Sequence, residues 1–223
     1  MLLIRNNCCY DDCQQVLEQM PSLIDPVNFQ TLLLPDHSNK PMEPMAINTV
    51  HRTVLQTGAR NLAIHMTRLD HDMLSIRLDR NYGLPGISSG IHLITLIEGR
   101  QLRLDVMERC LCMRLFVLVS ILTGTNKDQS VRLMAKWIKV AEELRSSVGN
   151  YFGFFNVVSA LCHPSLQCLE SMWVRLRQEH TEQALNFDTR LRPTFRALNE
   201  LRESYPPQST VPNLIPFISG CRD

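Results

Sequence analysis

The chain has 223 residues, of which 44% are apolar and 20% are charged. This composition indicates one or two globular domains with a substantial core and excludes disorder throughout. A formal net charge of +1 gives no long-range field for nucleic acid or an anionic membrane. There is no secretory signal, and the longest apolar run, residues 115–122, is too short to span a membrane. We therefore expect a cytoplasmic protein with reduced cysteines, no nucleic-acid partner and no membrane span.

Residues 1–42 have the character of a linker or a loosely ordered lead-in. Five prolines occur in residues 1–45, and sustained apolar periodicity is missing there. Residues 12–20 can form one short helix that stops before Pro21, because the residue before a proline is disfavoured in a helix. The folded domain is expected to comprise residues 43–223.

The first two helices are predicted from apolar residues at helical spacing. Residues 43–57 place Ile47, Val50 and Val54 on one face, and Gly58 ends the helix. Residues 59–76 follow with apolar residues at spacings of 4, 3, 4 and 3, which predicts one buried stripe made of Leu62, Met66, Leu69, Met73 and Ile76.

The middle of the chain predicts a loop and then a long helix. Residues 81–90 contain three glycines and a proline and form the loop. Residues 91–97 are strand-like but lack a clear partner, so we expect at most a short edge hairpin. Residues 100–122 form a helix ended by Gly124, nearly all buried in its second half, whose apolar stripe is Leu104, Met107, Leu111, Leu115, Leu118 and Leu122.

The remaining helices follow the same rhythm. Asp128 or Ser130 is expected to cap a helix that Gly149 ends. Residues 150–155 hold four aromatic side chains, which we expect to pack in the core at a helix junction. A helix over 154–161 stops before Pro164. Another apolar stripe at helical spacing follows, made of Leu166, Leu169, Trp173 and Leu176, and one more helix runs to about Arg202. Seven or eight helices without an internal repeat predict an all-α fold.

The cysteines do not form a metal-binding pattern. Cys110 and Cys112 point about 200° apart on a helix, so they cannot easily share an ion. Cys162, His163 and Cys168 lack the paired short spacing of zinc sites. A core or surface role is the simpler interpretation, and we expect no bound metal.

Residues for catalysis or cofactor binding are likewise not indicated. His65 and His71 lie on a predicted helix without a nucleophile motif nearby. The glycines at 83, 86 and 90 have neither a preceding strand nor a following Lys-Ser/Thr pair, so they do not form a phosphate loop. We expect no catalytic residue and no cofactor.

Six segments together resemble the catalytic domain of Ras exchange factors, the RasGEF domain. They are residues 59–76, KWIKVAEELR (136–145), the Asn150-Tyr151 pair, SAL (159–161), residues 169–173 and VPNLIPF (211–217). The resemblance implies that the core signature positions are Leu62, Leu69, Trp137, Ile138, Ala141, Asn150, Leu161, Leu169 and Trp173. The segments lie in order over about 160 residues, which makes chance a poor explanation.

Three further segments resemble one branch of that superfamily. They are KPMEPMAINTV (40–50), EGRQLRLDVMER (98–109) and residues 173–200. They are similar to the C-terminal domain of the NSP adapters, the novel Src-homology-2-containing proteins that bind Cas scaffold proteins. This resemblance implies an intracellular signalling adapter that docks a Cas-family scaffold and has little or no exchange activity. The alternative is an active exchange factor for Ras, R-Ras or Rap.

Exchange involves no covalent step, because the factor acts by binding the nucleotide-free GTPase better than the loaded one. The resemblance implies that a helical hairpin after the third block does this work. The chain ends at Asp223, six residues after Phe217. We therefore expect a partial RasGEF-like domain without the hairpin and without most of the docking helices. No residue is assigned an exchange role, and the chain is expected to be a fragment, a short isoform or an incomplete gene model.

Overall fold

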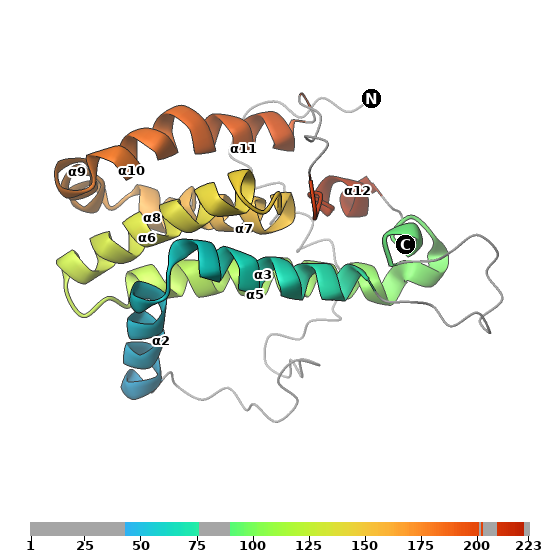
Figure 1. Ribbon diagram of the computed structural model, residues 1–223, viewed down its shortest axis with the longest axis horizontal. Helices are drawn as coiled ribbons and strands as arrows, with labels where there is room; N and C mark the ends of the chain where they lie inside the picture. The colour runs from blue at the N-terminus through green and yellow to red at the C-terminus, as the bar shows by residue number, and fades with distance from the viewer. Residues whose placement is uncertain (1–42, 76–89, 201, 203–208, 221–223) are drawn as a thin grey trace.

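The computed structural model describes residues 43–75, 90–200, 202 and 209–220 (Figure 1). The predicted lead-in, the helix at 12–20, Ile76 and most of the predicted loop lie outside these ranges. The elements are, in chain order, α2 (Pro44–Gln56), α3 (Ala59–Leu74), α4 (Gly90–Leu93), the 3-10 turn η2 (Ile97–Gly99), α5 (Arg100–Leu122), α6 (Lys127–Ser146), α7 (Tyr151–Leu161), α8 (Pro164–Gln167), α9 (Glu170–Glu179), α10 (Thr181–Asn186), the π-helical turn η3 (Phe187–Leu191), α11 (Arg192–Asn199) and α12 (Ile215–Gly220). The all-α prediction is confirmed for the described residues.

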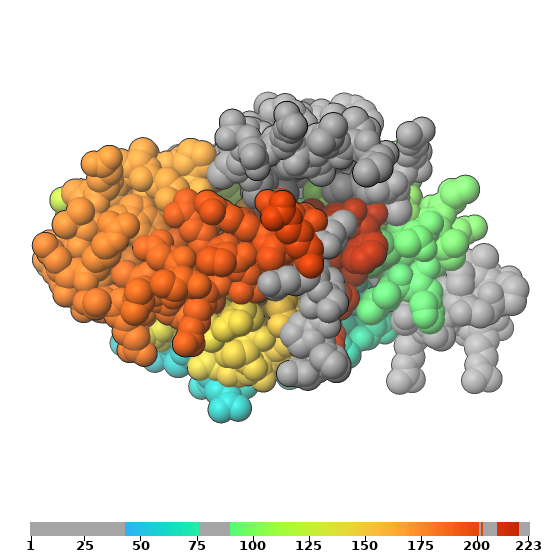
Figure 2. Space-filling model, turned by 90° about the horizontal axis from the view of Figure 1, so that it is seen from above, coloured from blue at the N-terminus to red at the C-terminus, as the bar shows by residue number. Residues whose placement is uncertain are grey.

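Helix α7 forms the centre of the fold, since all of its 11 residues are buried. Helix α6 packs beside it and also contacts α3, α5 and α9. In Figure 1 these two helices form the middle tier, with α3 and α5 below them and α9 to α11 above. Figure 2 looks onto that upper tier and shows it as an outer layer. A helix that is apolar on all sides, such as α7, is stable only when other helices cover it.

The start of α6 differs from the prediction. Asn126 is the capping residue, because its side chain accepts a hydrogen bond from the Gln129 backbone N–H at 2.8 Å. Asp128 lies inside the first turn and pairs with Arg175 of α9, while Ser130 is buried. The predicted end is confirmed: Gly149 has a φ of 66°, a left-handed conformation that suits glycine.

The aromatic segment after Gly149 lies inside α7, which begins at Tyr151, three residues before the predicted start at 154. Tyr151, Phe152, Phe154 and Phe155 are all buried in its first turns, so the prediction of core packing is confirmed. The Asn150 side chain caps this helix by accepting a hydrogen bond from the Gly153 N–H at 2.7 Å.

Residues 91–97 contain no strand, so the short edge hairpin that the sequence allowed is not formed. Helix α4 and turn η2 occupy this stretch. The buried Arg103 guanidinium donates to the carbonyls of Ile94 and Leu96 at 3.1 and 2.6 Å. The Leu96 carbonyl also accepts a hydrogen bond from the Gly99 N–H at 3.1 Å, so a turn closed by backbone and side-chain donors replaces the strand. Gly99 is required here, since a Cβ atom would lie 1.8 Å from the Leu93 carbonyl oxygen.

The buried face of α3 is rotated from the predicted stripe. Leu69 is 59% exposed, so its assignment to the core was wrong. Leu62 and Met73 are only partly buried. The residues that face the core are Ala63, Met66, Asp70 and Leu74. The charged Asp70 lies on the inner face because partners on α5 and α7 pair with it.

Helix α5 is also less covered than predicted. Leu115, Phe116 and Leu122 are 47%, 41% and 42% exposed, so the prediction that its second half is nearly all buried was wrong. Apolar residues occupy every side of this half, and the helices packed against it leave these three side chains partly exposed.

Helix α2 projects from the side of the bundle and is anchored by its second half (Figure 1). Val54 and His51 are buried, and the His51 ring lies 3.1 Å from the Thr123 hydroxyl through Nε2. Lys136 donates to the Leu55 carbonyl at 3.4 Å, and burial, with Lys139 nearby, lowers the pKa of Lys136. Val50 also packs partly against the core, as predicted.

The stripe from Leu166 to Leu176 lies on α8 and α9, and the predicted last helix is divided into α10, η3 and α11. Trp173 anchors this layer, since its ring stacks on Phe187 with centroids 5.3 Å apart. Its indole N–H donates to the Leu166 carbonyl at 2.9 Å. The tryptophan is therefore held by both stacking and a buried hydrogen bond.

Trp173→Ala is expected to lower the free energy of unfolding by about 3 to 5 kcal/mol, because it leaves a cavity beneath Phe187. Urea denaturation measures the change. Val174→Ala is the matched control, since Val174 is 50% exposed and should change stability by less than about 0.5 kcal/mol. Similar effects of the two substitutions would contradict the burial of Trp173.

Candidate functional site

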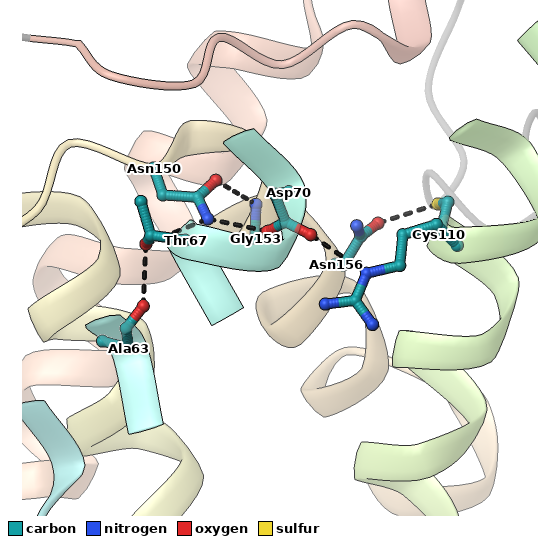
Figure 3. A network of polar contacts seen from close by, with 8 residues as sticks. Ala63, Thr67, Asp70, Cys110, Asn150, Gly153 and Asn156 are labelled. Atoms are coloured by element: carbon teal, nitrogen blue, oxygen red, sulfur yellow. Dashed lines mark hydrogen bonds and ion pairs between the residues drawn. The ribbon is translucent and has the colours of Figure 1, made fainter. Parts of the chain in front are cut away.

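A buried polar network joins helices α3, α5 and α7 (Figure 3). The Asp70 carboxylate accepts a hydrogen bond from Asn150 Nδ2 at 2.7 Å and from Arg109 Nε at 3.0 Å. Asn150 Nδ2 also lies 3.2 Å from the Thr67 hydroxyl, and Asn150 Oδ1 accepts from the Gly153 N–H. Asp70 is 1% exposed, so this network takes the place of its hydration shell.

A second polar contact lies beside this network. The Cys110 thiol donates to the Asn156 side-chain oxygen at 2.7 Å, and both residues are buried. It links α5 to α7 next to Arg109 on α5 and six residues after Asn150, as Figure 3 shows. Two adjacent polar links fix how these helices lie on one another, because each buried polar group needs its own partner.

The segment at 209–218 is hydrogen-bonded to the backbone on either side of Asn150, next to the polar network. The Val211 carbonyl accepts a hydrogen bond from the Tyr151 N–H at 2.8 Å, and the Thr210 N–H donates to the Gly149 carbonyl at 2.9 Å. The Thr210 hydroxyl donates to the Val148 carbonyl at 2.6 Å. Because Val211 is itself buried, the third block of the resemblance lies directly against Asn150.

The network is suited to holding helices together and unsuited to reacting with a substrate. Both Asp70 oxygens have partners within the chain, and a buried carboxylate paired with an arginine is a poor general base. Among the described residues, no three His, Cys, Asp or Glu side chains are grouped to hold a metal ion. In the same ranges, no helix is long and apolar enough to cross a membrane.

A surface groove of about 560 Å³ lies between α6 and the α10–η3 segment. We call it the α6–α10 groove. Its lining residues are Ala59, Ile138, Lys139, Glu142, Glu143, Glu182, Gln183, Leu185, Asn186, Thr189 and Arg190. Leu185 is 61% exposed, and charges of both signs surround it. The groove is open and has no buried reactive group, so it fits a macromolecular partner better than a small substrate.

The signature positions occupy different environments. Most are core residues, at 0 to 7% exposure: Trp137, Ile138, Ala141, Asn150, Leu161 and Trp173. Leu62 and Leu169 are partly buried against that core, and Leu69 is on the surface. The structure therefore brings most of them into one interior and does not gather them at a surface site.

Sequence reasoning missed Asp70, Arg109 and Thr67. The available signal was Asp70 itself, a charged residue among the apolar positions of a helix that was predicted to face the core. Its partners could not be identified from local spacing, because Arg109 is 39 residues away and Asn150 is 80 residues away.

Asp70→Asn is expected to lower the free energy of unfolding by about 3 to 5 kcal/mol, because it leaves Arg109 without its charge partner. The new amide also faces the Asn150 amide nitrogen. Asp72→Asn is the control, since its pair with Arg68 is solvent-exposed at 3.9 Å and contributes less than about 1 kcal/mol. Chemical denaturation of both variants measures this. Equal losses would show that the network does not hold the fold together.

Comparison with known proteins places the chain in a family. The RasGEF domain profile matches residues 61–221. SH2 domain-containing protein 3C of Homo sapiens is 37% identical over 207 residues, which is 90% of this chain and 24% of that protein. The breast cancer anti-estrogen resistance protein 3 homolog of Mus musculus is 36% identical over 211 residues, 91% of this chain and 25% of that protein. The chain spans about a quarter of the length of these curated relatives. The predicted resemblance is confirmed, and the chain belongs to the RasGEF domain family, with relatives of the NSP type.

Proposed function

We propose that residues 43–223 form the RasGEF-like domain of a cytoplasmic signalling adapter, with residues 1–42 as a lead-in. It acts in small-GTPase signalling by binding protein partners, Cas-type scaffolds among them, and has little or no exchange activity. The observation that carries this proposal is the similarity to SH2 domain-containing protein 3C and to the resistance protein 3 homolog over about 90% of the chain.

The arrangement of polar groups supports a binding role. The polar network faces inward, where it joins α3, α5 and α7. The described surface offers open grooves without a buried reactive group. A protein that acts through such surfaces must bind another macromolecule. It changes that partner only if it binds one of the partner's states more tightly than the other.

The α6–α10 groove is the surface that we propose for a helical scaffold. Leu185 is an exposed apolar residue in the groove, and Ile138 also lines the groove. Lys139, Glu182 and Arg190 surround Leu185 with charge. An amphipathic helix binds in this way, with its apolar face in a groove and its polar flanks paired at the edges.

The first test is nucleotide release. A stoichiometric amount of the chain is expected to leave the rate of labelled GDP release from Ras, R-Ras and Rap at the intrinsic value. An established exchange factor serves as the positive control for each GTPase. Clear acceleration by the chain would support the alternative, an active exchange factor, which the RasGEF domain match favours.

The second test is scaffold binding. Leu185→Arg is expected to weaken binding to the helical bundle of a Cas-type scaffold by about tenfold or more, because it places a charge at the apolar point of the groove. Val174→Arg is the matched control, since Val174 is 50% exposed on α9 and does not line the groove. Calorimetry measures both affinities.

Two results of the binding test would contradict different parts of the proposal. Tight binding by Leu185→Arg would place the scaffold on another surface. Failure of the unmodified chain to bind any Cas-type bundle would contradict the partner class for the chain as given.

A further inference from the structure

Helix α6 carries a row of positive charges on its outer side. Arg132, Lys136 and Lys139 follow one another at spacings of 4 and 3 residues, so they lie on one stripe of the helix. Arg132 and Lys139 are exposed, and Lys136 is partly buried. Arg52 of α2 is also exposed and lies beside the start of this stripe, where it lines a surface hollow together with Gln129. We call these four cations the α6 basic surface.

The end of α2 and the start of α3 run along this stripe. At one end, the hollow of about 360 Å³ lies between α2 and the first turn of α6. Further along α6, Lys136 donates a hydrogen bond to the Leu55 carbonyl at 3.4 Å. At the other end, Lys139 and Ala59 both line the α6–α10 groove. The cations are therefore neighbours along residues 129–139, which is about 15 Å of helix.

The carboxylates that would normally neutralise such a stripe have other partners. Within a helix, opposite charges four residues apart pair readily. Asp128 lies four residues before Arg132, but it forms an ion pair with α9. Glu143 lies four residues after Lys139, and it accepts a hydrogen bond from the Ser147 hydroxyl. Among the described residues, no ion pair includes any of the four cations.

The charges of the α6 basic surface therefore act on one another. Burial, together with the nearby charge of Lys139, lowers the pKa of Lys136. Cations that are held together without a counter-charge create a local positive potential, even on a protein whose net charge is only +1. A ligand with several negative charges would relieve this repulsion.

The groups around the hollow favour a peptide ligand over a membrane or a nucleic acid. Its lining residues are Met45, Asn48, Thr49, Arg52 and Gln129. No aromatic side chain is among them, so a base has nothing to stack on. The side-chain amides of Asn48 and Gln129 can hydrogen-bond to a peptide backbone. A flexible chain can also enter a hollow between two helices, whereas a bilayer presents a flat surface.

We propose that the α6 basic surface binds an acidic segment of a partner protein, held extended with Asp or Glu at alternate positions. Alternate side chains of an extended chain lie on the same side, about 7 Å apart. Three such carboxylates span about 14 Å, which matches the length of the stripe. This goes beyond the helical scaffold proposed for the α6–α10 groove, because the two surfaces share only Lys139.

The test is the binding of a fluorescein-labelled peptide of alternating glutamate and glycine to the full chain, measured by fluorescence anisotropy. We expect half-saturation below about 100 μM at about 50 mM salt, and much weaker binding at about 300 mM salt, because salt screens exposed charges. The same peptide with glutamine in place of glutamate should not bind.

Charge reversal locates the binding surface. Arg52→Glu and Arg132→Glu should each weaken peptide binding by about threefold to tenfold, because each variant removes a cation and adds repulsion. Arg196→Glu is the matched control, since it changes the net charge equally and Arg196 is exposed on α11. Leu185→Arg should not weaken peptide binding, so failure of this proposal and failure of the scaffold proposal can be told apart. Thermal melting followed by circular dichroism checks that each variant is folded.

Three results would overturn the proposal. The first is that the acidic peptide does not bind at low salt. The second is that Arg196→Glu weakens binding as much as Arg132→Glu does, which would mean that only the net charge matters. The third comes from separate probes, phosphatidylserine–phosphatidylcholine vesicles and a single-stranded oligonucleotide. Tighter binding of either probe, lost in Arg132→Glu, would assign the surface to a membrane or a nucleic acid.

Discussion

The fold depends on how one buried charge is satisfied. Asp70 is almost completely removed from water, and an isolated carboxylate in that position would cost several kcal/mol. Arg109 supplies the opposite charge, and Asn150 supplies a hydrogen bond while its own oxygen caps α7. One side chain on each of three helices is therefore fixed by the same set of contacts. The network lies where α7 begins, and the backbone of the neighbouring Gly149 and Tyr151 holds the segment at 209–211 beside it.

This interaction also explains what could and could not be predicted from the sequence. Helices such as 59–74 and 127–146 were predictable because their apolar residues repeat at helical spacing and glycines mark their ends. The side of α3 that faces the core was not predictable in the same way. Apolar spacing favoured Leu69, yet Asp70 is buried because it meets partners far away in the sequence. The outer side of α5 was misjudged for a related reason, since apolar composition does not indicate how many sides a helix has covered.

The candidate site differs in kind from an enzyme centre. Six of the nine signature positions lie in the interior. The match to the RasGEF domain family therefore reflects mainly residues that pack the core. Packing residues are needed by any member of such a fold, whether or not it accelerates nucleotide release. The proposed binding function depends instead on exposed residues such as Leu185, which is 61% exposed. The all-α fold could therefore be predicted from the sequence, whereas the partner is a proposal.

A double-mutant cycle between Asp70 and Asn150 tests most directly whether this network organises the fold. Asp70→Ala, Asn150→Ala and the double variant are compared by their free energies of unfolding in urea. If the two side chains act as one unit, the second substitution costs less once the first is made, and the coupling energy is about 1 to 3 kcal/mol. Effects that add within about 0.5 kcal/mol would show that the two residues contribute independently, and would contradict the central place given to their contact.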